Sequence, residues 1–397
     1  MKKVRLGIVG LGARGRHMGL LYHNRIKDCQ VVAICDHLNP VLERVAAEIG
    51  NPDIKTFTDY GQMLREADID AVGVFIEPDR QADLICEALY AGKHVTCDVP
   101  LAFTFEGCWK VLIAVEKTGM KFLLSEQTRY WPFIQAWREM AARGELGKIF
   151  FMEGQYFHEL RTGKYFWVDA VTGKWLRDDE IAGNPNARKT WRNGMHPIVY
   201  MPHELSPLLS IIDDRVVKTT CFATRPSSYV IPGVEMPDIE VALMHTEKDT
   251  ILRLACSFTV SRPLPNHWYH VWGTKGEVET KRDEAAKHKM WLAEEMLRSD
   301  SPKDMDWSYD PKTLPQEAVG SGHDGADYFP AAAFVKCIIE DTAPPLDVYR
   351  AVDITAPAVA ASISAAQGGS CIYVPDFRPS VNRALGQMPK GVKAQDY

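Results

Sequence analysis

A glycine-rich turn near the N-terminus constrains the fold most strongly. An apolar run over residues 4–9 leads directly into Gly10-Leu11-Gly12-Ala13-Arg14-Gly15. In this G-x-G-x-x-G pattern the first glycine permits a tight turn, the second lets a pyrophosphate approach the backbone, and the third lets helix and strand pack closely. The N-terminus of the following helix offers N–H groups and a positive dipole end to phosphates. The turn predicts a dinucleotide-binding parallel sheet, with a glycine turn in an unliganded α/β domain as the alternative. Its expected cofactor residues are Gly10, Gly12, Ala13, Arg14 and Gly15.

A carboxylate after the next expected strand indicates which dinucleotide binds. The apolar run 31–35 ends at Asp36, 21 residues after Gly15. An acid at this spacing accepts the adenosine ribose hydroxyls and repels a 2′-phosphate, which favours NAD over NADP. His37 and Arg14 lie nearby as further cofactor residues and leave NADP open.

Strand and helix signals alternate through the first 125 residues or so, which implies a parallel sheet covered on both faces. The expected strands are 4–9, 31–35, 71–76, 94–97 and 121–125, and the expected helices are 40–50, 80–91 and 105–118, with a short helix capped at Asp59. We assign residues 1–125 to an NAD-binding Rossmann domain. Residues 126–397 form a substrate-binding and oligomerisation α/β domain.

The pattern changes in the second part of the chain. Residues 148–158 alternate like a half-buried strand, and short turns separate two pairs of expected strands, 239–245 with 250–260 and 268–272 with 277–280. These signals predict an α+β domain with a large, mostly antiparallel sheet. We expect irregular structure over 159–195, a charged surface excursion over 281–320, and closing helices over 329–339 and 348–366 that pack back on the first domain.

Composition excludes several classes of protein. The net charge is −6 without a basic block, which argues against a nucleic-acid partner. No apolar stretch approaches 18 residues, so we expect no membrane span and no signal peptide. The nine cysteines form no Cys-x-x-Cys and lie mostly in apolar runs, which indicates reduced core thiols in a cytoplasmic protein.

Three segments carry a resemblance to a known family. They are the glycine turn, residues 91–95 followed by Asp98-Val99-Pro100, and residues 273–276. With them, nearly the whole chain resembles the Gfo/Idh/MocA sugar oxidoreductases. The resemblance implies a C-terminal sheet that packs face to face, and hence a homodimer or homotetramer. It also implies a Glu-Lys-Pro motif whose lysine helps move the substrate hydroxyl proton, and here Val99 occupies the lysine position.

That departure resembles one branch of the family, which includes the NAD-dependent family 109 glycosidases. The matching segments are Gly154-Gln155-Tyr156-Phe157-His158, Tyr200-Met201-Pro202-His203, His323-Asp324-Gly325-Ala326-Asp327, Asp347-Val348-Tyr349 and Val374-Pro375-Asp376-Phe377. The resemblance places Tyr156, His158, Tyr200 and His203 around the sugar. Residues 159–195 have their own sequence, so the identity of the sugar does not carry over.

The spacing of these four residues also allows an interpretation that does not depend on the resemblance. Tyr156 and His158 are two apart on an expected strand and share a face, which lines either a pocket or the core. Tyr200 and His203 are three apart, about one helical turn, where they relay a proton or where His203 holds a helix start.

Other polar residues follow expected strands of the parallel sheet. Glu77 and Asp98 lie at its carboxyl edge as cofactor-site residues, turn residues or helix caps, and Glu126 resembles a cofactor-edge position. His323 and Asp327 form either a metal pair or a hydrogen-bonded loop, and without a third ligand at metal spacing we expect the loop and no metal. Four tryptophans either stack on sugar faces or belong to the core: Trp131, Trp167, Trp175 and Trp191.

Together these patterns predict an NAD-dependent oxidoreductase that acts on a sugar or glycoside. Hydride leaves a ring carbon, C3 of a pyranose, and gives a ketosugar, while Tyr200 with His203 or His158 accepts the hydroxyl proton. A ketone acidifies the neighbouring C–H, so oxidation, elimination, hydration and reduction would instead give a redox-neutral glycosidase or lyase. A non-catalytic NAD-binding sugar sensor is the second alternative.

Overall fold

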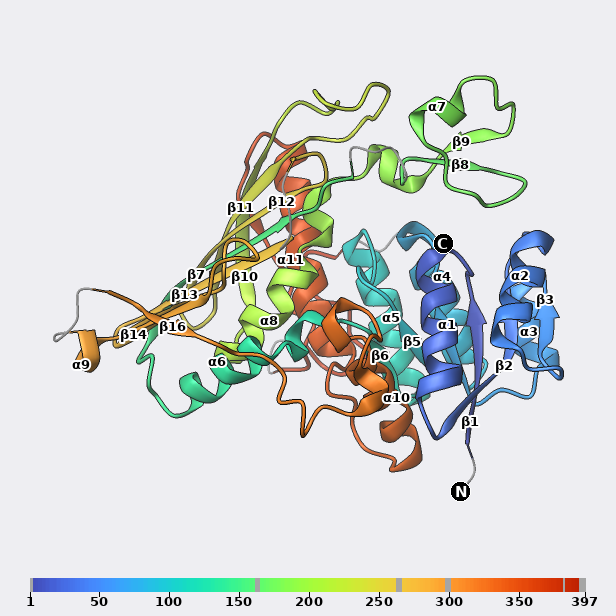
Figure 1. Cartoon of the computed structure of the whole chain (residues 1–397), viewed down its shortest axis with the longest axis horizontal. Helices are drawn as coiled ribbons and strands as arrows, with labels where there is room; N and C mark the ends of the chain where they lie inside the picture. Colours follow the sequence, from blue (N-terminus) through green and yellow to red (C-terminus); the bar gives the residue numbers. More distant parts are fainter. Residues whose placement is uncertain (1–2, 161–164, 262–265, 297–300, 381–382, 393–397) are drawn as a thin grey trace.

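Two large β-sheets organise the chain. The computed structural model describes residues 3–160, 165–261, 266–296, 301–380 and 383–392. The N-terminal sheet and its helices lie to one side, and a long C-terminal sheet extends away from them (Figure 1). Helices α5 (Phe105–Thr118) and α11 (Val348–Ala366) lie between the two sheets and contact each other.

The six strands of the first sheet are parallel, in the order β3-β2-β1-β4-β5-β6. They span Val4–Val9 (β1), Cys29–Cys35 (β2), Lys55–Phe57 (β3), Ala71–Val74 (β4), His94–Cys97 (β5) and Phe122–Leu124 (β6). Strand β4, in the middle of the sheet, is buried at every position because helices cover both faces. This arrangement confirms the predicted Rossmann fold.

The helices that connect these strands begin and end where short-range chemistry requires. They are α1 (Ala13–Arg25), α2 (Asn39–Ile49), α3 (Tyr60–Glu66), α4 (Pro78–Tyr90) and α5. The Asp59 side chain accepts from the Gln62 N–H to cap α3, as expected. Gly50 ends α2 and Gly119 ends α5, both with left-handed backbone that favours glycine. A later helix, α10 (Tyr328–Ile339), packs beside α1 and shares its core.

The second sheet has nine strands in the order β16-β15-β14-β13-β7-β12-β11-β10-β17. Its neighbours pair antiparallel except β7 with β12, which confirms the predicted mostly antiparallel sheet. The strands are β7 (Ile149–Phe157), β10 (Val216–Ala223), β11 (Glu240–Thr246), β12 (Ile251–Ser257), β13 (His267–Gly273), β14 (Gly276–Glu279), β15 (His288–Leu292), β16 (Lys303–Met305) and β17 (Ile372–Tyr373).

The two faces of this sheet differ. Helices α6 (Pro132–Ala142), α8 (Pro202–Ile212) and α11 lie along one face (Figure 1). The strand register places four exposed apolar side chains on the other face: Phe222, Leu243, Ile251 and Tyr373.

The expectation of irregular structure over 159–195 is wrong in part, and the segment 281–320, expected as a charged surface excursion, contains short regular elements. The segment 159–195 contains a small antiparallel pair, β8 (Trp167–Asp169) with β9 (Ala187–Lys189), and helix α7 (Asp178–Ile181). The segment 281–320 supplies β15, β16 and α9 (Ala293–Met296). These elements are short and mostly polar, so they carry no clear periodicity in the sequence.

In the described part of the chain, short 3-10 turns complete the fold: η1 (Thr128–Tyr130), η2 (Trp191–Gly194), η3 (Pro197–Tyr200), η4 (Gln316–Ala318) and η5 (His323–Gly325). All nine cysteines are free thiols, and seven of them are buried. Across the described ranges, no helix has the length and apolarity that crossing a membrane requires.

Candidate active site

The glycine turn at the end of β1 fits a dinucleotide. Gly10 has a φ of 80°, and a Cβ there would lie 2.4 Å from the Phe75 carbonyl oxygen. A Cβ on Gly15 would lie 1.8 Å from the Gly10 carbonyl oxygen, so both positions require glycine. A Cβ on Gly12 would meet nothing within 4 Å, which leaves that side of the turn open to a ligand.

The groups around the turn suit the pyrophosphate and the adenosine ribose of NAD. Helix α1 has no side-chain cap and no acid in its first turn, so its first N–H groups are free for a pyrophosphate. Asp36 ends β2, and its carboxylate accepts from the Leu11 N–H at 2.9 Å and the Leu38 N–H at 3.0 Å. These bonds hold the carboxylate at the turn, where it suits ribose hydroxyls. His37 is exposed beside it, with Nδ1 3.4 Å from Asp36 Oδ1.

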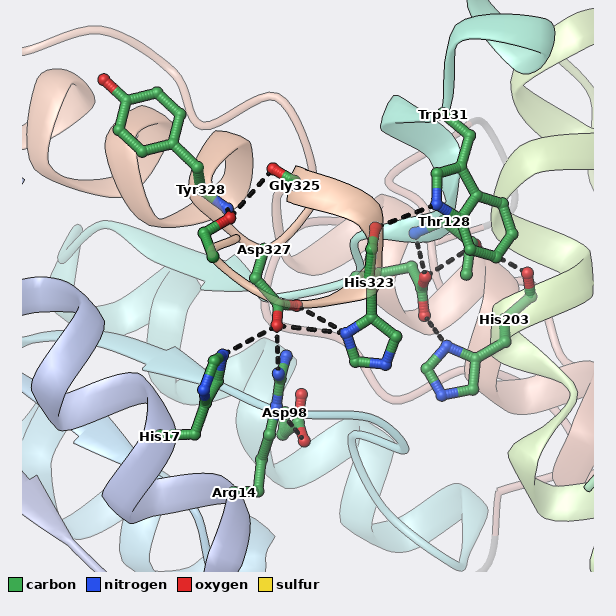
Figure 2. Close-up of polar contacts among 12 residues, drawn as sticks. Arg14, His17, Asp98, Thr128, Trp131, His203, His323, Gly325, Asp327 and Tyr328 are labelled. Atoms are coloured by element: carbon green, nitrogen blue, oxygen red, sulfur yellow. Dashed lines mark hydrogen bonds and ion pairs between the residues drawn. The ribbon is translucent and has the colours of Figure 1, made fainter. Parts of the chain in front are cut away.

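The Arg14 side chain binds two carboxylates of the protein (Figure 2). Its Nε donates to Asp98 at 3.0 Å and its Nη1 to Asp327 at 2.8 Å. Asp327 also lies 3.0 Å from His17 Nε2 and 3.0 Å from His323 Nδ1. Burial raises the pKa of Asp327, but Arg14 and the two histidine contacts outweigh it and hold that pKa well below its usual range. The network ties the first turn of α1 to the 322–327 loop, the hydrogen-bonded loop that was one of the two alternatives.

Three predicted acids lie at the carboxyl edge of the parallel sheet. Glu77 is exposed at the start of α4 and makes no side-chain cap. Asp98 follows β5, and Glu126 follows β6. Val99, at the position of the family lysine, is buried and apolar. The edge therefore carries acids but no lysine at that position.

Glu126 and His203 form a buried acid–imidazole pair. Glu126 Oε1 accepts from the Thr128 backbone N–H at 2.8 Å and from the Thr128 hydroxyl at 2.7 Å, and Glu126 Oε2 lies 2.7 Å from His203 Nδ1. Burial raises the pKa of Glu126. His203 and the two Thr128 hydrogen bonds lower it by more, so the pKa of Glu126 lies below its usual value. A carboxylate on Nδ1 orients the ring and leaves Nε2 for chemistry.

The structure brings all four predicted sugar-site residues together. The Tyr156 ring lies 5.3 Å from the His203 ring, 6.3 Å from Tyr200 and 5.9 Å from His158. The Tyr200 and His203 rings are 6.0 Å apart. They do not share one helical turn as predicted, because Tyr200 ends η3 and His203 follows Pro202 in the first turn of α8.

The two tyrosines and His158 have shifted pKa values. Burial raises the pKa of Tyr156 well above its usual range. Burial also raises the pKa of Tyr200, although Arg192 opposes this by donating to the Tyr200 hydroxyl at 2.8 Å. Burial lowers the pKa of His158 and favours its neutral form. Near neutral pH, a neutral imidazole is therefore a better proton acceptor here than either phenol.

Several residues of this cluster escaped the sequence analysis. The His267 ring stacks on Tyr156 at 4.4 Å, and its Nδ1 lies 2.7 Å from Glu204 Oε1. Burial lowers the pKa of His267 and raises that of Glu204, both strongly, which favours the neutral form of each group. Tyr269 donates to the His203 carbonyl at 2.9 Å. The expected strand began one residue after His267, so the alternation that would have flagged it was lost.

The candidate tryptophans have different surroundings. Trp191 stacks on Tyr200 with centroids 6.1 Å apart, and Trp131 donates from its indole to the His323 carbonyl at 3.2 Å. Trp175 packs on Tyr165 at 4.3 Å, whereas Trp167 is half-buried in β8. Trp191 and Trp131 therefore border the cluster.

Two family models match different parts of the chain. Residues 4–125 match the oxidoreductase family with the NAD-binding Rossmann fold, Gfo/Idh/MocA. Residues 233–381 match the glycosyl hydrolase 109 C-terminal domain. Together the matches confirm the resemblance seen in the sequence, and NAD is the cofactor.

Relatives and solved structures agree with both matches. A glycosyl hydrolase family 109 protein from Streptomyces niveus is 27% identical over 401 residues, 94% of this chain and 77% of the relative. Another, from Phocaeicola vulgatus, is 27% identical over 297 residues, 70% of each chain. The structure of levoglucosan dehydrogenase with NADH shares the fold at a TM-score of 0.77 and 17% identity, covering 95% of this chain and all of that one. Scyllo-inositol dehydrogenase from Lactobacillus casei with NAD(H) and scyllo-inositol gives 0.68 and 16%, covering 94% and 99%.

Proposed function

We propose that this protein is an NAD-dependent oxidoreductase that removes hydride from a ring carbon, C3, of a sugar or glycoside. The observation that carries the proposal is the Glu126–His203 pair, which lies beside Tyr156 and Tyr200 at the edge of the NAD-binding sheet. An oriented imidazole next to a hydride acceptor is what the oxidation of an alcohol requires.

Different residues of the chain have different roles in the proposed oxidation. Bound NAD supplies the hydride acceptor. His203 Nε2 accepts the proton of the sugar hydroxyl, while Glu126 holds Nδ1 and stabilises the imidazolium that forms. Tyr200 binds the sugar with its hydroxyl held by Arg192. Val99 has no proton to exchange, so the family lysine has no counterpart in this step.

A redox-neutral glycosidase is the second candidate, and the match to the glycosyl hydrolase 109 C-terminal domain favours it. A ketone at C3 acidifies the C2–H bond. A base then removes the C2 proton, and the C1 substituent leaves. Water adds to the resulting double bond at C1, and reduction of the C3 ketone restores the alcohol. This course needs a second proton acceptor, and neutral His158 stands 5.9 Å from Tyr156 on the same strand face.

One experiment separates these outcomes. A panel of chromogenic glycosides is incubated with the NAD-loaded protein while aglycone release and NADH absorbance are followed together. Aglycone release without net NADH identifies the glycosidase, and NADH accumulation identifies the dehydrogenase. Sugar binding with neither signal leaves the sensor and contradicts the proposal.

We also propose that the protein assembles as a homodimer or homotetramer through the open face of the nine-stranded sheet. Phe222, Leu243, Ile251 and Tyr373 are 65%, 49%, 38% and 74% exposed there. A shared apolar face on neighbouring strands is typical of an interface between subunits. The division at residue 125 and the cytoplasmic location remain predictions, which limited proteolysis and fractionation would test.

A further inference from the structure

A polar pocket lies behind the Glu126–His203 pair. It has a volume of about 250 Å³, and η1, α8, the N-terminal half of α11 and the β11–β12 turn line it. Arg129 and Ser206 reach it from the two segments that also carry Glu126 and His203. Nothing in the proposed reaction uses this pocket.

Arg129 lies in this pocket, and no carboxylate of the described residues forms an ion pair with it. Arg129 is buried, with only 7% of its surface accessible to solvent. No ion pair or side-chain hydrogen bond reaches its guanidinium from the described residues. Burial lowers its pKa and outweighs the opposing effects of Tyr130 and Glu126, while the charges of Arg138 and Arg350 add to the lowering. A buried cation without a partner carries a desolvation cost that an anion would offset.

Ser206 gives a second, independent observation. Its hydroxyl is buried and has no hydrogen-bond partner within the described ranges, although the residue lines the same pocket. A buried hydroxyl without a partner is uncommon because the unmade bond costs free energy. It can donate to an oxygen that enters the pocket.

The other charges of the pocket largely satisfy one another. Arg215 pairs with Glu247, and Arg378 pairs with Asp353. Asp213 faces Arg350 at 3.5 Å and is mostly exposed, and Asp214 accepts from the Lys248 backbone N–H at 3.1 Å. Lys248 is exposed and donates its Nζ to the Asp213 backbone carbonyl. Among the described residues, Arg129 is therefore the buried cation of this pocket whose guanidinium has neither an ion pair nor a hydrogen bond.

We infer that this pocket is a binding site for a small oxyanion, a phosphate or a carboxylate, held by Arg129 with Ser206 as a second donor. Both groups bind a guanidinium through paired N–H···O bonds, so one site serves either source. An anion there restrains η1 and α8 together. Those segments carry Thr128 and His203. A bound anion would therefore affect the position of His203, the proposed base.

The test measures binding and does not depend on turnover. The protein is first saturated with NAD, so that phosphate cannot report on the glycine turn. Inorganic phosphate and succinate are then titrated separately by calorimetry and by thermal shift, against sodium chloride at equal ionic strength. We expect one equivalent of at least one probe to bind and to raise Tm. Binding of phosphate alone or succinate alone names the source.

Variants then locate the site. Arg129→Gln weakens the bound probe about tenfold or more, and Ser206→Ala weakens it a few-fold. Arg138→Gln is the matched control, because it removes a neighbouring cation that does not line the pocket, and it leaves binding nearly unchanged. If Arg129→Gln does not fold, Ser206→Ala carries the test. The inference is overturned if neither probe binds, if Arg129→Gln binds normally, or if the control loses as much affinity. NAD titration reports separately on the proposed function.

Discussion

Replacing Glu126 with glutamine tests the proposed proton path most directly. The amide oxygen of Glu126→Gln can still accept the two Thr128 bonds now made at 2.8 and 2.7 Å. Its NH2 group then faces His203 Nδ1, which lies 2.7 Å from the present carboxylate oxygen. Because an amide nitrogen only donates, Nδ1 must give up its proton and Nε2 must carry one. The nitrogen that faces the substrate can no longer accept a proton.

The size of the effect follows from the role of the base. A positioned general base contributes about 10²–10⁴-fold to a rate. This range corresponds to about 2.7–5.5 kcal/mol of activation free energy. We expect kcat for Glu126→Gln to fall by such a factor, while NAD affinity and KM change little, because the two carboxylate oxygens of Glu126 face Thr128 and His203.

The assay needs a control for the loss of a buried charge. Glu153 is 6% exposed and pairs with Arg253 on the face of β7 opposite to Tyr156. Glu153→Gln should lower Tm at least as much as Glu126→Gln and leave kcat nearly unchanged. If Glu126→Gln keeps turnover within a few-fold of the unmutated protein, the imidazole is not the base, and a dead Tyr200→Phe would transfer that role to Tyr200.

Three further perturbations follow. Asp36→Ala should weaken NAD more than NADP in fluorescence titrations, because the carboxylate selects the free ribose hydroxyl; equal affinity for both in the unmutated protein contradicts this. Leu243→Glu places a charge on the open sheet face and should convert the oligomer to monomers in light scattering, whereas a monomeric unmutated protein refutes the interface. Asp327→Asn should destabilise the fold by about 1–3 kcal/mol at neutral pH. The carboxylate of Asp327 has a pKa lowered by folding, so its stabilisation is present above about pH 4 and fades on further acidification, and the variant should show a shallower loss of Tm in acid.

The regular elements of the fold could be predicted because each carries its own local signal. The expected helix over 348–366 coincides with α11, and the expected helix over 105–118 coincides with α5. Apolar periodicity and caps such as Asp59 act over a few residues, so a single sequence reveals them. The edge strand β16 and its neighbour β15 were missed because short strands such as these gain their structure from pairing with the strand beside them.

The site was predictable only in its members and not in its contacts. Tyr156, Tyr200 and His203 came from a resemblance, yet the group that orients His203 is Glu126, which was expected only at the cofactor edge. That contact joins the end of β6 to the start of α8, and no local pattern links the two. The partner of His267 is Glu204, again on another element, so neither could be inferred from spacing.

The position of His203 explains how this chain can dispense with the family lysine, which Val99 replaces. A lysine at that position would deliver its proton chemistry from the edge of the Rossmann sheet, whereas His203 belongs to α8, which packs on the nine-stranded sheet. We infer that the reacting hydroxyl of the sugar faces α8 and that the Val99 side chain only fills space beneath it. Asp98 fits this inference, since its carboxylate accepts from Arg14 and so belongs to the network that ties α1 to the 322–327 loop. Introducing Val99→Lys into a His203→Ala protein should therefore leave turnover low, because the new amine would approach the substrate from the wrong side.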